Sequence, residues 1–207
     1  MAKLYFRYSA MNAGKSTALL QVAHNYESQG RAVAIYTAEL DSRFGIGVVT
    51  SRLGISRQTR TFNASTDFAQ ELTGSNDWSN VANQRSDAAG ERSDGAVLVC
   101  VLIDESQFLS PTQVFDLHRI AHVQNIPVIC YGLRSDFVGE PFPGASYLMT
   151  LADSIEELKT VCPCGKKATM NVRFDKQGRR LRTGSQIAIE GTVSYIPMCG
   201  TCFYTKD

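Results

Sequence analysis

The sequence has almost no net charge, because 21 lysines and arginines stand against 20 aspartates and glutamates. Proteins that bind nucleic acid or anionic membranes through charge usually have a clear basic excess, so this balance argues against both partners. The chain also lacks an apolar run of membrane-spanning length, and its N-terminus is short and strand-like rather than a signal peptide. We therefore expect a cytoplasmic protein that binds neither nucleic acid nor membrane.

The cysteines are few and divide by position. Cys100 and Cys130 lie inside apolar runs, which predicts buried free thiols. The other four form two close pairs near the C-terminus, namely Cys162, Cys164, Cys199 and Cys202. In a reducing compartment such pairs favour a metal over a disulfide, and four thiolates suit tetrahedral Zn²⁺. Redox thiols and disulfides remain alternatives, because the C-x-C spacing of the first pair is only moderately specific.

The strongest motif lies close to the N-terminus. An apolar run at 4–6 leads into a loop of small residues, and a helical pattern follows it. The loop consists of Ser9, Ala10, Met11, Asn12, Ala13, Gly14, Lys15, Ser16 and Thr17. Strand, loop, Gly-Lys-Ser and helix in this order predict a phosphate-binding P-loop, in which backbone N–H groups and Lys15 face the phosphates and Ser16 binds Mg²⁺.

One position of that loop departs from the motif. Ser9 stands where a glycine is usual. A side chain there costs about 1–2 kcal/mol if the backbone needs a positive φ. We therefore expect the loop to enter its turn differently.

A second signal is the apolar run 97–103, which is followed directly by Asp104 and Glu105. A wholly apolar strand is expected in the centre of a parallel sheet, covered on both faces. Asp104 at its carboxyl end suits a Mg²⁺ ligand, and Glu105 suits a group that orients or deprotonates a nucleophile. Ser110, Pro111 and Gln113 then predict the start of a helix with a capping box.

Apolar runs at 32–37, 97–103 and 126–131 alternate with helical patterns. This order predicts an α/β fold of the P-loop NTPase type, with a doubly wound, mostly parallel sheet. We read 44–64 as a loop with one short strand, and Phe142–Gly144 as a turn. The polar segment 73–95 is expected to be an extended or mobile loop.

The C-terminal part has a different character. The two cysteine pairs enclose a hairpin-like stretch at 175–178 and a long connection at 184–195. Together they predict a small zinc ribbon whose long loop forms a lid. We therefore divide the chain into a P-loop domain, 1–158, and a zinc-ribbon domain, 159–207.

A P-loop with a strand-terminal Asp-Glu pair leaves three hypotheses open. They are a small-molecule kinase, a nucleic-acid-driven ATPase with a zinc ribbon, and a regulatory nucleotide-binding module. The ATPase requires a basic, aromatic-rich surface, which the composition does not provide. A binding module has little use for Glu105 beside Asp104. The residues therefore favour the kinase.

Four motifs in order resemble the type II thymidine kinases, the cytosolic and bacterial family. They are the segments 6–17, 104–108 and 131–137 and the cysteine pairs, and the resemblance covers nearly the whole chain except about 73–95. It implies ATP-dependent phosphorylation of the 5′-hydroxyl of thymidine, with deoxyuridine as a weaker substrate. It also implies a homotetramer that is inhibited by thymidine triphosphate bound in the acceptor site.

The resemblance also assigns roles to residues. Glu105 matches the general base, while the P-loop, Asp104 and Gln107 match the positions that hold ATP and Mg²⁺. A zinc ion in the cysteine site is implied as well. The thymidine pocket is matched by Met11, Phe108, Leu133, Phe137, Phe142, Ile187, Ile189, Gly191 and Tyr195. The last four belong to a loop that closes over the base.

Overall fold

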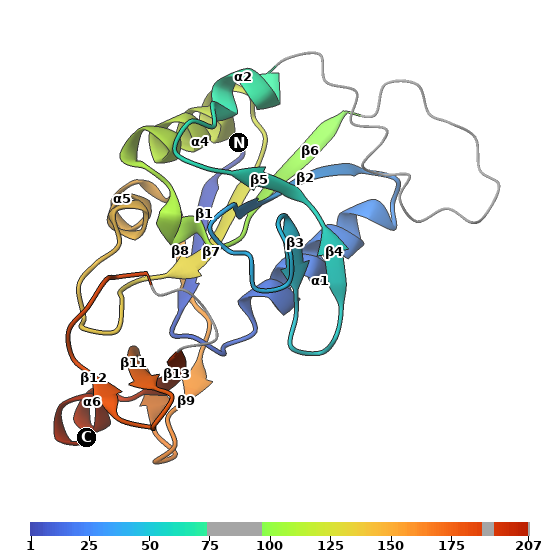
Figure 1. Cartoon of the computed structure of the whole chain (residues 1–207). Helices are drawn as coiled ribbons and strands as arrows, with labels where there is room; N and C mark the ends of the chain where they lie inside the picture. Colours follow the sequence, from blue (N-terminus) through green and yellow to red (C-terminus); the bar gives the residue numbers. More distant parts are fainter. Residues whose placement is uncertain (74–96, 188–192, 207) are drawn as a thin grey trace.

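A six-stranded parallel sheet forms the centre of the protein. The computed structural model describes residues 1–73, 97–187 and 193–206 (Figure 1). The strand order is β5-β2-β6-β7-β1-β8, and every neighbouring pair is parallel. The strands are β1 (Leu4–Ser9), β2 (Ala32–Ala38), β5 (Arg60–Phe62), β6 (Leu98–Ile103), β7 (Val128–Leu133) and β8 (Ser154–Glu157). The predicted α/β fold with a mostly parallel sheet is confirmed.

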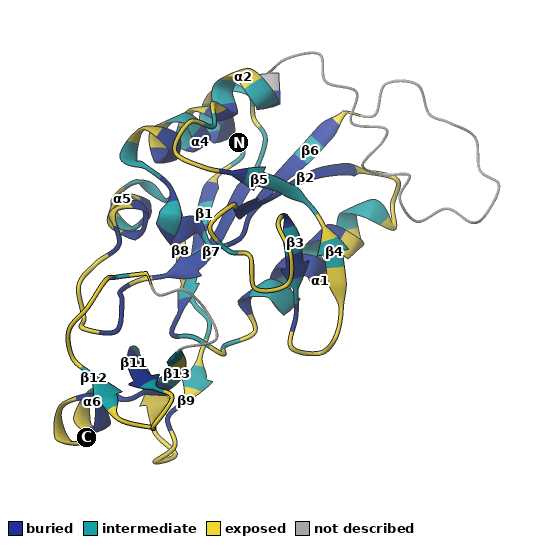
Figure 2. Ribbon diagram, viewed as in Figure 1, coloured by how far each residue is buried: buried dark blue, intermediate teal, exposed yellow. Residues whose placement is uncertain are grey.

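Helices cover both faces of this sheet, which is why β2 and β7 are buried along their whole length (Figure 2). On one face, α1 (Lys15–Glu27) buries Leu19, Leu20 and Ala23. On the other face lie α2 (Phe68–Thr73), α4 (Pro111–Val123) and α5 (Pro143–Leu151). The helix α4 begins with the predicted capping box of Ser110 and Gln113.

Two expectations about connecting segments are wrong. Pro143 is not part of a turn but occupies the first turn of α5, where its missing N–H costs nothing. The segment 44–64 contains three strands, because β3 (Val48–Thr50) and β4 (Ser56–Gln58) form an antiparallel hairpin before β5 joins the main sheet. Arg57 on the hairpin donates from Nη1 to Glu27 Oε2 at 2.6 Å, which ties the hairpin to α1.

The C-terminal lobe consists of the described residues 159–187 and 193–206. It contains the pair β9 (Thr160–Val161) and β10 (Lys167–Ala168), and a three-stranded sheet in the order β12-β11-β13. The strands of that sheet are β11 (Met170–Asp175), β12 (Arg180–Leu181) and β13 (Val193–Met198), and α6 (Gly200–Thr205) follows. The hairpin predicted at 175–178 joins β11 to β12. The boundary at 158/159 stays a prediction.

Two further expectations from the sequence concern the segment 73–95 and membrane-spanning runs. The loop expected at 73–95 lies outside the described residues, except for Thr73, which ends α2. Within the described ranges, none of the helices has the length and apolar character needed to cross a membrane.

Candidate functional site

The P-loop connects the end of β1 to the start of α1. Asn12 and Gly14 have left-handed backbone, with φ of 65° and 79°. Gly14 precedes the helix directly, and no side chain caps the first amides of α1. These N–H groups are therefore available to an anion. Ser9 is not among the residues with a positive φ, so the strain considered for its side chain does not arise.

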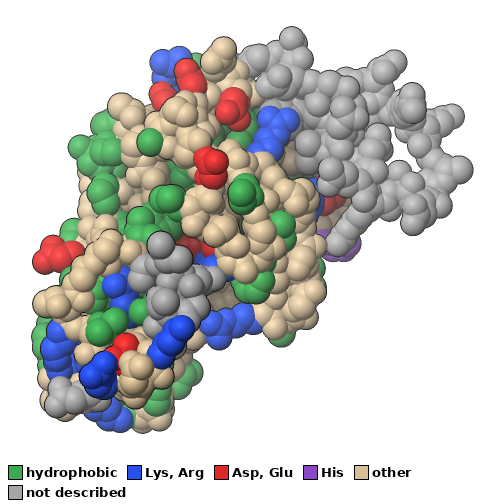
Figure 3. All heavy atoms as spheres, viewed as in Figure 1, with side chains coloured by type: hydrophobic (Ala, Val, Ile, Leu, Met, Phe, Trp, Pro, Cys, Tyr) green, Lys and Arg blue, Asp and Glu red, His purple; other side chains and the backbone are tan. Residues whose placement is uncertain are grey.

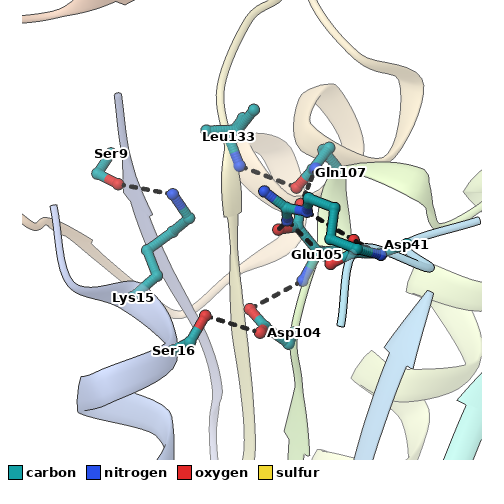
Figure 4. A network of polar contacts seen from close by, with 9 residues as sticks. Ser9, Lys15, Ser16, Asp41, Asp104, Glu105, Gln107 and Leu133 are labelled. Atoms are coloured by element: carbon teal, nitrogen blue, oxygen red, sulfur yellow. Dashed lines mark hydrogen bonds and ion pairs between the residues drawn. The ribbon is translucent and has the colours of Figure 1, made fainter. Parts of the chain in front are cut away.

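Lys15 and Ser16 both point toward polar groups at the ends of strands (Figure 4). Lys15 Nζ donates to Ser9 Oγ at 3.1 Å, and Ser16 Oγ donates to Asp104 Oδ2 at 3.0 Å. Burial lowers the pKa of Lys15, although the charges of Glu105 and Asp104 oppose this shift. Burial raises the pKa of Asp104 to about 7, and the charge of Glu105 adds to the shift. A carboxylate in this environment is stabilised by a cation placed beside it.

Glu105 lies at the centre of a polar network (Figure 4). Its backbone is left-handed, with φ of 51° and ψ of 37°, which turns the side chain away from β6. Arg43 Nη2 donates to Glu105 Oε1 at 2.6 Å, and the same guanidinium binds both oxygens of Asp41. Gln107 Nε2 donates to Glu105 Oε2 at 2.5 Å, and Gln107 Oε1 accepts from Leu133 N at 3.0 Å.

A close approach of backbone supports this network. A Cβ on Gly132 of β7 would lie 2.6 Å from Ser106 Oγ and 2.9 Å from Gln107 Oε1. Only glycine therefore lets β7 pack against the turn that carries Glu105 and Gln107.

Two cavities meet at this network. The larger, of about 760 Å³, is lined by P-loop residues 11–17, by the hairpin residues 48–53 and by Asp104. The smaller, of about 250 Å³, has mostly apolar walls that include Phe108, Phe137 and Phe142. The residues that line both cavities are Met11, Asp41, Arg43, Glu105 and Leu133. The Glu105 carboxylate thus stands between a phosphate-binding loop and an apolar pocket.

The C-terminal lobe contributes Asn171, Gln186, Ile187 and Tyr195 to the wall of the smaller cavity, and Arg173 binds two of them. This side chain on β11 is 3% exposed, and its guanidinium carbon lies 3.6 Å from the centre of the Phe137 ring. Its Nε donates to Tyr195 Oη at 2.9 Å, while Nη1 and Nη2 donate to the carbonyl oxygens of Ser185 and Gln186 at 2.8 and 2.9 Å. Arg173 therefore holds together one ring of the pocket wall and both ends of the segment 185–195.

Asn171 and Asp136 add two more links between the lobes. Asn171 Oδ1 accepts from Met11 N at 2.7 Å, and its Nδ2 donates to Ser135 O at 3.2 Å. Asp136 Oδ2 accepts from Gln186 Nε2 at 3.2 Å. Asn171 thereby connects β11 directly to the P-loop.

The four C-terminal cysteines come together as the sequence predicts. Their sulfur atoms all lie within 4.8 Å of one another, and Cys164 Sγ is 3.4 Å from Cys162 Sγ and 3.6 Å from Cys199 Sγ. These separations are far longer than a disulfide bond and are close to the roughly 3.8 Å between thiolates around a tetrahedral Zn²⁺. The cluster therefore fits a zinc site. Cys100 and Cys130 are buried and free, as expected.

Lysine and arginine side chains on the face shown in Figure 3 gather mainly over the C-terminal lobe. Arg179 pairs with Asp175 at 2.8 Å, and Arg180 Nη1 donates to Lys206 O at 2.6 Å. These two arginines therefore bind within their own lobe.

Most of the predicted site residues are gathered by the fold. The residues Met11, Phe108, Leu133, Phe137, Phe142, Ile187 and Tyr195 line the smaller cavity, whereas Ile189 and Gly191 lie outside the described residues. Gln107 lines the smaller cavity rather than the one beside the P-loop. The sequence patterns assigned no role to Asp41, Asn171 or Arg173. The sequence signal for Asp41 was a polar residue just after an apolar strand. For Asn171 and Arg173 it was a polar residue within a strand that also carries apolar residues.

The fold and the loop define a P-loop nucleotide-binding protein of the α/β class. Comparison with known proteins narrows this class. A family model described as thymidine kinase matches residues 2–203. A thymidine kinase of Chromobacterium violaceum is 50% identical over 204 residues, which cover 99% of each chain. A thymidine kinase of Albidiferax ferrireducens is 52% identical over 204 residues, which cover 99% of this chain and 93% of the relative. The chain belongs to the thymidine kinase family.

The cysteine cluster generates the first prediction. Protein purified under reducing conditions should contain about one zinc per chain, measured by elemental analysis. Cys199→Ser removes one thiolate and should lose most of this metal. Cys100→Ser is the control: it changes a buried thiol far from the cluster in sequence, and the variant should retain the metal. Wild-type protein without stoichiometric metal would rule out the zinc site.

Proposed function

We propose that this protein transfers the γ-phosphoryl group of ATP to the 5′-hydroxyl of thymidine, giving thymidine monophosphate and ADP. One observation carries the proposal: Glu105 lines both the cavity of the phosphate-binding loop and the apolar cavity. A donor phosphate and an acceptor hydroxyl can therefore meet beside one carboxylate. Membership of the thymidine kinase family supports thymidine as the acceptor.

On the donor side, the free amides at the start of α1 and the ammonium group of Lys15 suit the β- and γ-phosphates. Lys15 is held by only one described hydrogen bond, to Ser9, which it can exchange for a phosphate oxygen. Ser16 and Asp104 lie 3.0 Å apart, and both offer oxygen to a Mg²⁺ ion. When bound, this ion neutralises the charge that develops on the phosphate oxygens.

Glu105 is placed to act as the general base. It takes the proton of the 5′-hydroxyl while the oxygen–phosphorus bond forms and the bond to the β-phosphate oxygen breaks. Arg43 and Gln107 occupy one position on each of its oxygens, and each carboxylate oxygen keeps a second lone pair for the proton. Arg43 also brings positive charge to the boundary of the two cavities, where the transferred group passes.

On the acceptor side, the apolar walls of the smaller cavity suit a nucleobase. The rings of Phe108 and Phe142 contact each other edge to face, with their centroids 5.7 Å apart. Gln186, Ile187 and Tyr195 line this cavity, and Arg173 holds Gln186 and Tyr195 in place. Water that competes with the sugar hydroxyl is excluded more effectively when a chain segment covers the substrate.

The family relationship also supports two expectations from the sequence, a homotetramer and inhibition by thymidine triphosphate in the acceptor cavity. Both stay predictions, as does the cytoplasmic location.

The acceptor is tested by measuring ADP release with ATP·Mg²⁺ and thymidine, deoxyuridine, cytidine or no acceptor. We expect rapid release with thymidine, slower release with deoxyuridine, and background rates otherwise. Equal rates with and without thymidine would identify an ATPase instead.

Glu105→Gln keeps the size and hydrogen bonding of the side chain but cannot accept the proton. We expect kcat to fall by about 10²- to 10⁴-fold with little change in either KM. Asp104→Asn should additionally weaken the dependence on Mg²⁺, because it removes charge from the metal side. Single-turnover kinetics separate chemistry from product release, and unchanged chemistry in Glu105→Gln would remove Glu105 from the mechanism.

Arg173→Met removes three hydrogen bonds, to Tyr195 Oη and to the carbonyl oxygens of Ser185 and Gln186. It also removes the cation–π contact to the Phe137 ring. Hydrogen bonds to charged groups each contribute about 1.5–3 kcal/mol, so the KM for thymidine should rise by more than about tenfold. The KM for ATP should change little, since Gln186 and Tyr195, which Arg173 binds, line the smaller cavity and not the P-loop cavity. Arg179→Met, an exposed arginine of the same lobe, serves as the matched control. Equal effects on both substrates would assign Arg173 to stability alone.

A further inference from the structure

A second group of potential metal ligands lies on α4, on the side of the sheet opposite α1. His118 and His122 are one helical turn apart, and their ring centroids are 4.4 Å from each other. Asp153, just after α5, lies against them, and one ligand atom from each of the three residues falls within 4.8 Å of the others. No residue of this group lines either cavity of the candidate site.

The carboxylate of Asp153 is held in position from two directions. Its Oδ2 accepts from Leu4 N at 2.8 Å and lies 3.0 Å from His122 Nε2. Desolvation alone raises the pKa of Asp153, but the hydrogen bond from the Leu4 amide and the charges of His122 and His118 together outweigh it and lower this pKa. Both imidazoles therefore act on this carboxylate, which is ionised at neutral pH.

We propose that His118, His122 and Asp153 form a binding site for a late first-row divalent cation such as Zn²⁺ or Ni²⁺. Two imidazole nitrogens at i and i+4 of a helix with one carboxylate oxygen make a donor set that these ions prefer. Mg²⁺ is a poor occupant, because it requires oxygen ligands in near-ideal octahedral geometry. The side chains of His122 and Asp153 are 29% and 27% exposed, which leaves coordination positions open to water.

Such an ion would join three parts of the chain. The histidines belong to α4, Asp153 precedes β8, and the Leu4 amide that binds Asp153 starts β1. An ion that binds only the folded protein stabilises it, because Asp153 lies 31 residues from His122 in the sequence and comes beside the two histidines only in the folded chain.

The experiment uses the full chain with zinc in its cysteine site and without a polyhistidine tag. Titration with NiCl₂ in a calorimeter should reveal one saturable equivalent with a micromolar Kd. The same addition should raise the unfolding temperature.

Three substitutions make the test specific. His118→Gln and His122→Gln should each weaken Ni²⁺ binding by at least about tenfold. His24→Gln, which changes the exposed third histidine on α1, should bind as the wild type does. His122→Gln also removes the contact to Asp153. For each variant, the rise in unfolding temperature with Ni²⁺ is therefore measured against the same variant without metal. No saturable equivalent in the wild type, or equal Kd values in all four proteins, would overturn the proposal.

Discussion

The hydrogen bond between Ser16 and Asp104 joins the first helix to the end of a central strand, and the rest of the candidate site depends on it. It exists because β1 and β6 are parallel and β7 lies between them, so their carboxyl ends share one edge of the sheet. Lys15 and Glu105 are the chain neighbours of these two residues. Lys15 and Glu105 both line the larger cavity, so a cation and a carboxylate face the same space. The cost of burying these charges is reduced by their mutual attraction.

This dependence explains how much the sequence could predict. A P-loop and a carboxylate pair after an apolar strand are local signals, and parallel strands bring local signals of this kind to one edge. The cysteine cluster was predicted from its two close pairs, and the apolar pocket from the resemblance to the thymidine kinase family. The strain considered at Ser9 depended on a positive φ, which a motif does not report, and the left-handed residues of the loop are Asn12 and Gly14.

The missed features depend on contacts between distant segments. Arg173 looks like an ordinary surface arginine in the sequence, and only the fold places Phe137, Ser185 and Tyr195 around it. The segment 44–64 looked like a loop, because its three strands have three residues each and too few side chains for a periodic pattern. Pro143 resembled a turn residue, although proline is equally at home in the first turn of a helix.

The position of β1 in the sheet affects when this strand can fold during synthesis. β1 lies between β7 and β8, and Leu4 pairs with Val128 while Tyr5 pairs with Ser154. During synthesis the first strand therefore has no partner on either side until most of the chain has left the ribosome. Closing loops of this length is entropically costly and slows folding. The nucleotide-binding loop is thus synthesised before β7 and β8, and it reaches its native surroundings only after both strands have joined β1.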